Sequence, residues 1–356
     1  MIGPIGGEMA GQAGFFDFDR RLEAISAKGD PLETIDRTVP WEAFRGAIEA
    51  ATVTQPQDKK SNAGRPAYDA ILKFKMLVLA ALYNLSDEAL EFQVRDRLSF
   101  MRFLGFDLHH PVPDATTIWL FREALVKAEK IDPLFDLFKQ HLEAKGFIAR
   151  GGQIIDATIV EAPRQHNTRD ENQQVKAGET PKDWEKKPAK NRQKDKDARW
   201  TKKHGKSYFG YKNHVGIDRT HKLIRAWDVT DASVHDSQKL DDLLDAGNTS
   251  RDVWADSAYR SEAAEARLAE KGYNSRIHFR AWRDHPLDET QKNANRARSE
   301  VRARVEHVFG DMTTAMGGTM VRTIGEARAR FKIGMTNLGY NVRRLCALER
   351  MAAASA

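Results

Sequence analysis

The sequence predicts a chain of two parts, an all-α region followed by a larger α/β domain. Before about residue 147 the apolar residues recur at helical spacing, whereas runs rich in β-branched residues that alternate with helical stretches appear after it. A strongly cationic segment interrupts the second part. Because single domains usually hold about 100 to 200 residues, a chain of 356 residues has room for both parts.

The composition points to a polyanionic partner. The formal net charge is +6 and the sequence pI is about 9.2. Residues 164–206 contain 14 Lys and Arg against 7 Asp and Glu, so the rest of the chain is close to neutral. The single cysteine, Cys346, excludes an internal disulfide framework and favours a reducing cytoplasm. No run reaches the roughly 18 apolar residues of a membrane span, so we expect a soluble cytoplasmic protein.

The first part is predicted to be a helical domain at 15–147, preceded by a Gly-rich disordered tail at 1–14. Residues 70–83 are apolar nearly all round, which predicts a buried central helix. Ser86 and Asp114 precede helical patterns and are expected to be N-caps.

Several arginines of this region lie on or beside the expected helices and are predicted to contact DNA phosphates. They include Arg65, Arg95 and Arg122. A helical bundle with a solvated basic face explains the same charges equally well, and charge alone does not separate the two explanations.

The second part, predicted at 148–350, opens on an apolar strand within 151–163 that carries Asp156 in its middle. A carboxylate in such a strand is costly unless something pairs with it. A divalent metal ion and a salt bridge both satisfy that need, and this strand taken alone favours the salt bridge.

The cationic segment at about 164–206 has few aliphatic residues and is predicted to be an exposed, flexible insertion. Trp184 and Trp200 within it suit stacking on nucleic-acid bases, with cations such as Lys206 on the phosphates. An ordinary solvated charge run is the alternative.

After the insertion, strands are predicted at 208–217, 222–229, 252–256 and 275–279, and helices at 237–246, 261–271, 289–309 and about 324–348. This order is that of a ribonuclease-H-like fold, a mixed sheet flanked by helices. In that fold the middle of the first strand and the end of the fourth lie side by side, so Asp156 and Asp256 should converge. Glu306, one helical turn after Arg302, is the best candidate for a third acid.

Three carboxylates from three segments suit a two-metal phosphodiester site. Two ions about 4 Å apart need hard oxygen ligands, one of them bridging, to activate an attacking oxygen and stabilise the leaving one. Mg²⁺ fits this donor set best, with Mn²⁺ as the alternative, because no dense Cys and His cluster favours a softer metal.

Short motifs then occur in order over about residues 40 to 345. They are Gly-Arg-Pro at 64–66, Pro-Asp-Ala-Thr-Thr-Ile-Trp-Leu-Phe-Arg at 113–122, Ile-Asp-Ala-Thr at 155–158, Tyr-Phe-Gly-Tyr-Lys at 208–212, His-Asp-Ser at 235–237, Ala-Asp-Ser-Ala-Tyr at 255–259, and Arg302 with Glu306. In this set the chain resembles the DDE transposases of the bacterial insertion-sequence-five family, within the insertion-sequence-four-like group.

The resemblance implies that Asp156, Asp256 and Glu306 are the catalytic, metal-binding triad. It also implies an N-terminal region that recognises terminal inverted repeats in double-stranded DNA, and a dimeric synaptic complex. Further DNA contacts are predicted at Arg302, Arg298, Lys212, Tyr259 and Lys206. His235 is a weaker candidate for a supporting role, because a His before an Asp at a helix start is more often a cap.

The chain departs from the family pattern at three positions: Ser299 and Thr313 stand where Tyr and Lys are common, and Ser257 where Lys is frequent. None of these removes a metal ligand. The predicted function is cleavage of insertion-sequence ends followed by transfer of the 3′-hydroxyl to target DNA. A nuclease of the same fold without strand transfer, and an inactive transposase-derived DNA-binding protein, are the alternatives.

Overall fold

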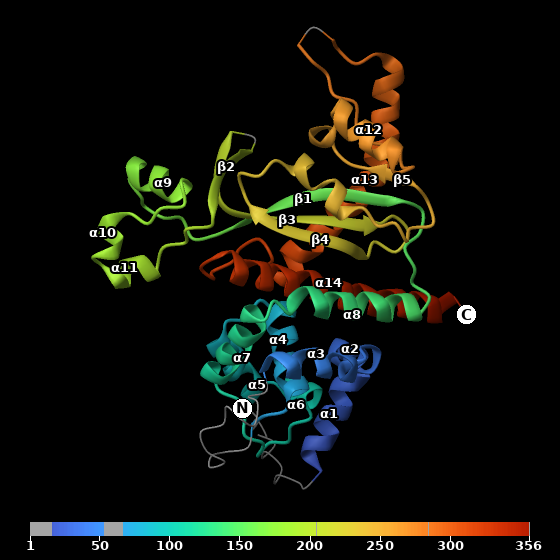
Figure 1. Cartoon of the computed structure of the whole chain (residues 1–356). Helices are drawn as coiled ribbons and strands as arrows, with labels where there is room; N and C mark the ends of the chain where they lie inside the picture. Colours follow the sequence, from blue (N-terminus) through green and yellow to red (C-terminus); the bar gives the residue numbers. More distant parts are fainter. Residues whose placement is uncertain (1–15, 53–66, 204, 284, 356) are drawn as a thin grey trace, which may run out of the picture.

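The computed structural model describes residues 16–52, 67–203, 205–283 and 285–355. The predicted tail at 1–14 and the predicted DNA contact Arg65 lie outside these residues. In the described part a helical layer lies on one side of the C-terminal helix α14 (Glu326–Ser355) and a mixed sheet lies on the other (Figure 1). No described helix is long and apolar enough to cross a membrane.

The helical layer contains eight α-helices within the described residues: α1 (Asp17–Ala27), α2 (Pro31–Thr38), α3 (Arg45–Thr52), α4 (Ala70–Leu82), α5 (Asp87–Asp96), α6 (Leu98–Leu104), α7 (Ala115–Lys127) and α8 (Ile131–Ala144). As predicted, α4 is the buried central helix. The predicted caps are confirmed, since the Ser86 side chain accepts from Ala89 N and the Asp114 side chain from Thr117 N.

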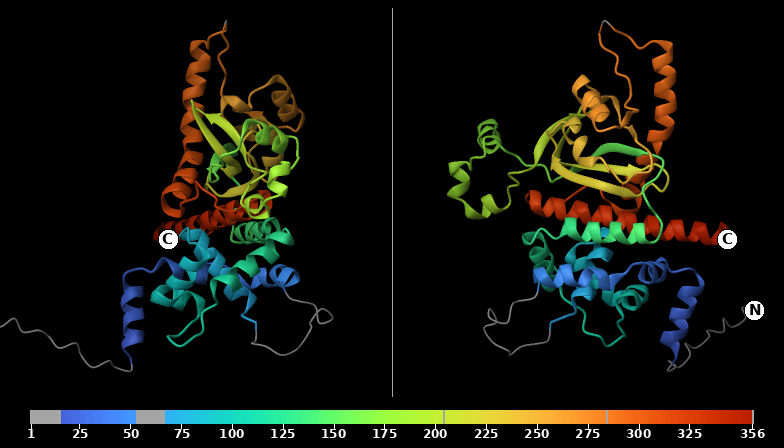
Figure 2. Two further views of the ribbon diagram at one scale, coloured as in Figure 1. Left: turned by 90° about the vertical axis from the view of Figure 1, so that its left-hand side faces the viewer. Right: turned by 45° about the vertical axis from the view of Figure 1, so that its right-hand side comes forward.

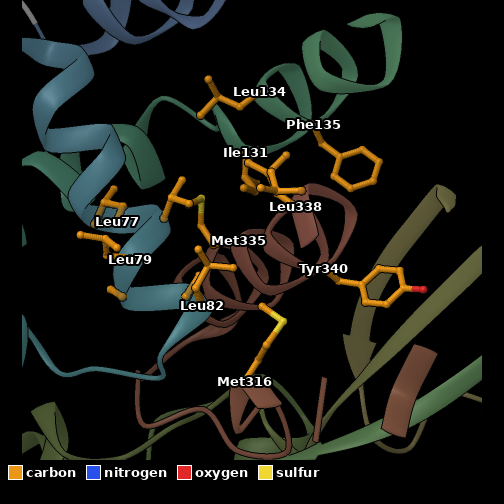
Figure 3. Close-up of a cluster of buried hydrophobic side chains, with 14 of the residues drawn as sticks. Leu77, Leu79, Leu82, Ile131, Leu134, Phe135, Met316, Met335, Leu338 and Tyr340 are labelled. Carbon is orange, nitrogen blue, oxygen red and sulfur yellow. The ribbon is translucent and has the colours of Figure 1, made fainter. Parts of the chain in front are cut away.

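Helix α14 joins the two parts because it is apolar on both sides. Its Met335 and Leu338 lie in one cluster with Leu82 of α4 and Ile131 of α8, while Tyr340 points toward the strands (Figure 3). Burial of these side chains against both layers makes α14 part of a single continuous core.

The sheet has the strand order β4-β3-β1-β5-β6, with β2 added beside β3. The strands are β1 (Gln153–Glu161), β2 (Arg199–Lys203), β3 (Lys206–Asp218), β4 (Ile224–Asp231), β5 (Asp252–Trp254) and β6 (Asn274–Ser275). β3 is antiparallel to β1 and β4, whereas β5 is parallel to β1 and to β6. This topology confirms the predicted ribonuclease-H-like sheet, and helices flank it in Figure 1.

Three predicted elements differ in extent. The helix expected at 237–246 is two 3-10 turns, Asp236–Lys239 and Asp241–Leu243. The strand expected at 275–279 pairs over two residues, because its partner β5 is itself only three residues long. Helix α12 is Glu262–Glu270, and α13 (Glu289–Met316) continues two turns past its predicted end. Glycine at 317, with φ 58°, then ends α13 in the left-handed region that Gly tolerates.

The prediction of a flexible cationic insertion is wrong in its local structure. The segment forms α9 (Arg169–Lys176), α10 (Lys182–Glu185) and α11 (Pro188–Arg192), which project from the sheet in Figures 1 and 2. Trp184 is fully buried among them, and its indole N–H donates to Oε1 of Glu171 at 2.6 Å. Trp184 is therefore the core of the insertion rather than a stacking residue, whereas Trp200 on β2 remains 42% exposed.

Candidate active site

Asp156 lies in the middle of β1, between the buried Ile155 and Ala157. Its Oδ1 accepts from the backbone N–H of Ala157 at 2.8 Å. Burial raises the pKa of the Asp156 carboxyl above its usual range, and the nearby charge of Asp256 adds to that rise. This carboxylate is thus held in a costly environment.

Asp256 lies beside Asp156, as the sequence predicts. β5 pairs with β1 in parallel, with Gln153 opposite Val253 and Ile154 opposite Trp254. Continuing the same register by two residues brings position 256 opposite position 156. The Asp256 side chain caps the 3-10 turn Ser257–Tyr259 by accepting from Ala258 N at 2.7 Å, which fixes the carboxylate at the end of the strand.

Arg302 of α13 is the cation at this pair. Its Nη2 lies 3.0 Å from Oδ2 of Asp156 and opposes the rise in the pKa of that carboxyl. The Nε–H of Arg302 is buried and has no hydrogen-bond partner in the structure. Figure 2 shows α13 running beside the sheet toward α14. Arg302 lies on this helix, and its ion pair with Asp156 places it against β1.

Glu306 follows Arg302 by one turn of α13, but its side chain is exposed. Within the described residues, no three His, Cys, Asp or Glu side chains are close enough together to hold a metal ion. The structure therefore brings Asp156 and Asp256 together and leaves Glu306 at the rim. Three facing carboxylates repel one another unless cations lie between them, and here the guanidinium of Arg302 faces Asp156.

Tyr259 is predicted to contact DNA, yet its ring is fully buried. Its hydroxyl has no hydrogen-bond partner. Burial raises the pKa of Tyr259 well above its usual value, and the charges of Asp156, Asp236 and Asp256 add to the rise. Tyr259 consequently lies under the carboxylates rather than on the surface.

Asp236 is a further acidic residue of this site, since its charge acts on Tyr259 together with those of Asp156 and Asp256, and the sequence pattern does not single it out. Its Oδ1 lies 2.8 Å from Nζ of Lys212. The sequence signal for Asp236 is the His-Asp-Ser motif at 235–237, which on its own predicts a helix cap. The cap is real, since Nδ1 of His235 accepts from Ser237 N at 3.3 Å.

The site residues fit a hard divalent cation. Asp156 and Asp256 supply carboxylate oxygens, and the buried hydroxyl oxygen of Tyr259, which lies near both charges, lacks a hydrogen-bond partner. Oxygen donors of this kind are the ligands that Mg²⁺ and Mn²⁺ prefer.

Two family models match the sequence. The transposase domain (DUF772) matches residues 20–124, and the transposase DDE domain matches residues 149–342, which is more than half of the chain. The chain belongs to the DDE transposase family. Proteins of this family cleave DNA and transfer strands, and they generally use divalent metal ions.

One solved structure is similar to this DDE transposase over most of its length. It is a cryo-EM structure of the piggyBac transposase synaptic complex with hairpin DNA. The match covers 91% of this chain and 76% of that chain, with 13% sequence identity and a TM-score of 0.47.

Two predicted DNA contacts near the active site of the transposase have internal partners. Nζ of Lys212 donates to the carbonyl of Val234 at 2.7 Å in addition to its ion pair with Asp236. Arg298 donates to the carbonyl of Ile277 at 2.6 Å and stacks over Phe279. Lys206, by contrast, is exposed at the start of β3.

Two predicted contacts in the helical region of the transposase are paired with carboxylates. Arg122 makes two hydrogen bonds to Asp87, at 2.6 and 2.8 Å. Arg95 pairs with Glu91 at 3.0 Å but remains 54% exposed. Of these two, Arg95 is the one whose charge faces solvent.

Proposed function

We propose that this DDE transposase cleaves the phosphodiester at each end of an insertion sequence and joins the freed 3′-hydroxyl to target DNA. The parallel pairing of β1 with β5 is the observation that supports this most strongly, because it brings Asp156 and Asp256 together from strands about 100 residues apart. The ordered motifs of the sequence support membership of the bacterial insertion-sequence-five group.

Asp156 and Asp256 would hold Mg²⁺, or Mn²⁺ in its place, with Glu306 as the third ligand. Two bound ions would supply the positive charge that activates the attacking oxygen and stabilises the leaving one. Arg302 is the proposed phosphate contact. Its Nη2 bonds to Asp156, so it can orient that carboxylate, and its side chain, which is 14% exposed, adds positive charge where a phosphate would approach.

Recognition of terminal inverted repeats is proposed for the helical region, with Arg95 at its exposed face. Tyr259 and Lys212 act by supporting the carboxylates, since both are largely buried. The insertion at 164–206 offers a cationic surface to DNA, and a homodimer would hold the two element ends in one synaptic complex. Salt should weaken binding steeply if many phosphates are contacted.

The test is cleavage of a duplex that carries the element's own flanking repeats, with Mg²⁺, by wild type and by Asp156→Asn. Asp252→Asn is the matched control, because Asp252 lies at the start of β5, four residues before Asp256, and its carboxylate pairs with Arg276 at 3.2 Å. Loss of a charge that stabilises the transition state should lower cleavage on the order of 10²- to 10³-fold.

The control should cleave like wild type, and wild type should also give joined product from a 3′-hydroxyl end. Full activity of Asp156→Asn would remove Asp156 from the chemistry. Cleavage by wild type without any joined product would assign the protein to the nucleases.

A further inference from the structure

A cavity of about 640 Å³ lies between the helical layer and the end of the sheet, away from the carboxylate pair. Residues from α2, α13 and α14 line it, together with the turn between β3 and β4. Its walls are partly apolar, and six basic residues line it: Arg37, Lys222, His307, Arg343, Arg344 and Arg350. Three of them lie together, since Lys222 contacts His307 and senses the charge of Arg344. We call these three residues the cation cluster.

Hydrogen bonds, and not ion pairs with carboxylates, hold the cation cluster in place. Nζ of Lys222 lies 3.1 Å from Nδ1 of His307, and Nε of Arg344 donates to the carbonyl of His221 at 2.6 Å. Tyr340, whose ring is buried, donates its hydroxyl to the carbonyl of Lys222 at 2.8 Å. Lys222 also has φ 59°, an uncommon value for a residue with a side chain, so the surrounding structure fixes its position.

The carboxylates of the cavity have other partners. Asp30 and Glu33 pair with Arg102, which does not line the cavity, and Asp311 pairs with Arg343 at 3.2 Å. In the described part of the chain, Lys222 and Arg344 form no ion pair with a carboxylate. Burial lowers the pKa of Lys222, and the positive charges of Arg344 and Arg304 lower it further. An anion between these groups would relieve that repulsion.

We propose that the cation cluster binds a backbone phosphate of the DNA on which the transposase acts. This rests on the proposed function, since it takes DNA as the substrate. His307 follows Glu306 directly and lies five residues after Arg302, which is about 7.5 Å along the axis of α13. Five residues also turn the helix by about 140°, so a strand that reaches the carboxylates would pass across α13 to place a second phosphate at the cation cluster.

The test is binding of a fluorescently labelled duplex of arbitrary sequence at several salt concentrations. Lys222→Gln removes one cation, and the slope of log affinity against log salt should fall by about 0.9, with Lys222→Arg restoring it. The matched control is Lys271→Gln, which makes the same change in charge at a lysine paired with Asp241 on the surface. The control should keep the wild-type slope.

A second variant covers the case in which Lys222→Gln does not fold. His307 is exposed, so His307→Glu should fold, and it places a carboxylate where the phosphate would lie. It should raise Tm by relieving the repulsion between the cations, and it should weaken binding of the duplex. An increase in affinity, or variants that bind with the wild-type affinity and slope, would overturn the proposal.

Inorganic phosphate separates DNA from a free anion as the ligand. If phosphate raises the Tm of wild type but not of Lys222→Gln, while binding of the duplex is equal in the two proteins, the site serves a free anion and the DNA assignment is wrong. A wild type that binds no duplex at all would contradict the proposed function as well. If wild type binds and cleaves DNA, and Lys222→Gln and His307→Glu bind it with the wild-type affinity and salt slope, the phosphate site is wrong and the proposed function stands.

Discussion

Arg122 of the helical layer and two cations beside the catalytic sheet, Arg302 and Lys222, differ in how their charges are compensated. In the helical layer, Arg122 makes two bonds to Asp87, whose side chain is only 15% exposed. Beside the sheet, Arg302 makes a single 3.0 Å bond to Asp156 and keeps a buried Nε–H without a partner. The partner of Lys222 is the imidazole of His307 and not a carboxylate.

This difference separates structural charges from functional ones. A cation that is fully paired with a carboxylate contributes to the fold, and little of its charge is available to a ligand. A cation with an unused donor, or with a partner that is not a carboxylate, still attracts an anion. We therefore infer that phosphates meet this protein along α13 and the sheet edge more than at Arg122.

The largest expected effect is at Glu306. Glu306→Gln removes the proposed third carboxylate and should lower metal-dependent cleavage on the order of 10²- to 10³-fold. Glu300→Gln is the control, because Glu300 is also exposed on α13 but points to another side of the helix. Equal rates of cleavage for the two variants, measured with saturating metal, would exclude Glu306 from the site.

Much of the catalytic part could be predicted from the sequence, because strand order and β-branched runs are local signals. They predict that Asp156 and Asp256 meet, which β1 and β5 confirm. Local charge predicts the exposure of a side chain less well than apolar patterns predict strands. Trp184 was assigned to a surface because its neighbours are cationic, but its indole lies inside α9–α11 and bonds to Glu171, a contact between residues 13 apart that no periodic pattern reveals.

The sequence does not show which residues a given side chain contacts in the folded protein. The sequence does not distinguish Arg122 from Arg302, because both are arginines in helical segments. Only the folded structure shows that Arg122 pairs with Asp87 and Arg302 with Asp156. The burial of Tyr259 was missed for the same reason. Its ring packs in a small cluster with Leu268 of α12 and with Ile155 of β1, and β1 is distant from Tyr259 in the sequence.

The next effect compares the same substitution at two arginines. Arg122→Lys loses the two-bond geometry to Asp87 and should lower the free energy of unfolding by about 1 to 2 kcal/mol, with cleavage by the folded protein unchanged. Arg302→Lys should do the reverse, with slower cleavage and a smaller change in stability. Urea denaturation and cleavage rates measured on both variants check this, and the opposite pattern would break the distinction between the two regions.

A smaller effect concerns His214, which is buried on β3 and contacts Thr230 through Nε2. Burial lowers its pKa to about 4 from the ordinary 6.5. Between these values the unfolded chain binds a proton that the folded chain does not. The free energy of unfolding should therefore fall as pH drops from about 6.5 to about 4, by up to about 1.4 kcal/mol per pH unit.

Denaturation of wild type and His214→Gln at several pH values measures this. In His214→Gln the free energy of unfolding should lack the decrease that protonation of His214 causes between about pH 6.5 and pH 4. Its dependence on pH from other groups should be unchanged. If the two proteins lose stability in parallel over this range, the proton is taken up elsewhere.

The central claim is that carboxylates from β1, the end of β5 and α13 act as one metal site. Calorimetric titration of Mn²⁺ into wild type, Asp156→Asn, Asp256→Asn, Glu306→Gln and the control Glu300→Gln tests it most directly. The account predicts binding by wild type and the control, and weaker or no binding by each of the other three. Wild-type affinity in Glu306→Gln, or in either aspartate variant, would contradict it.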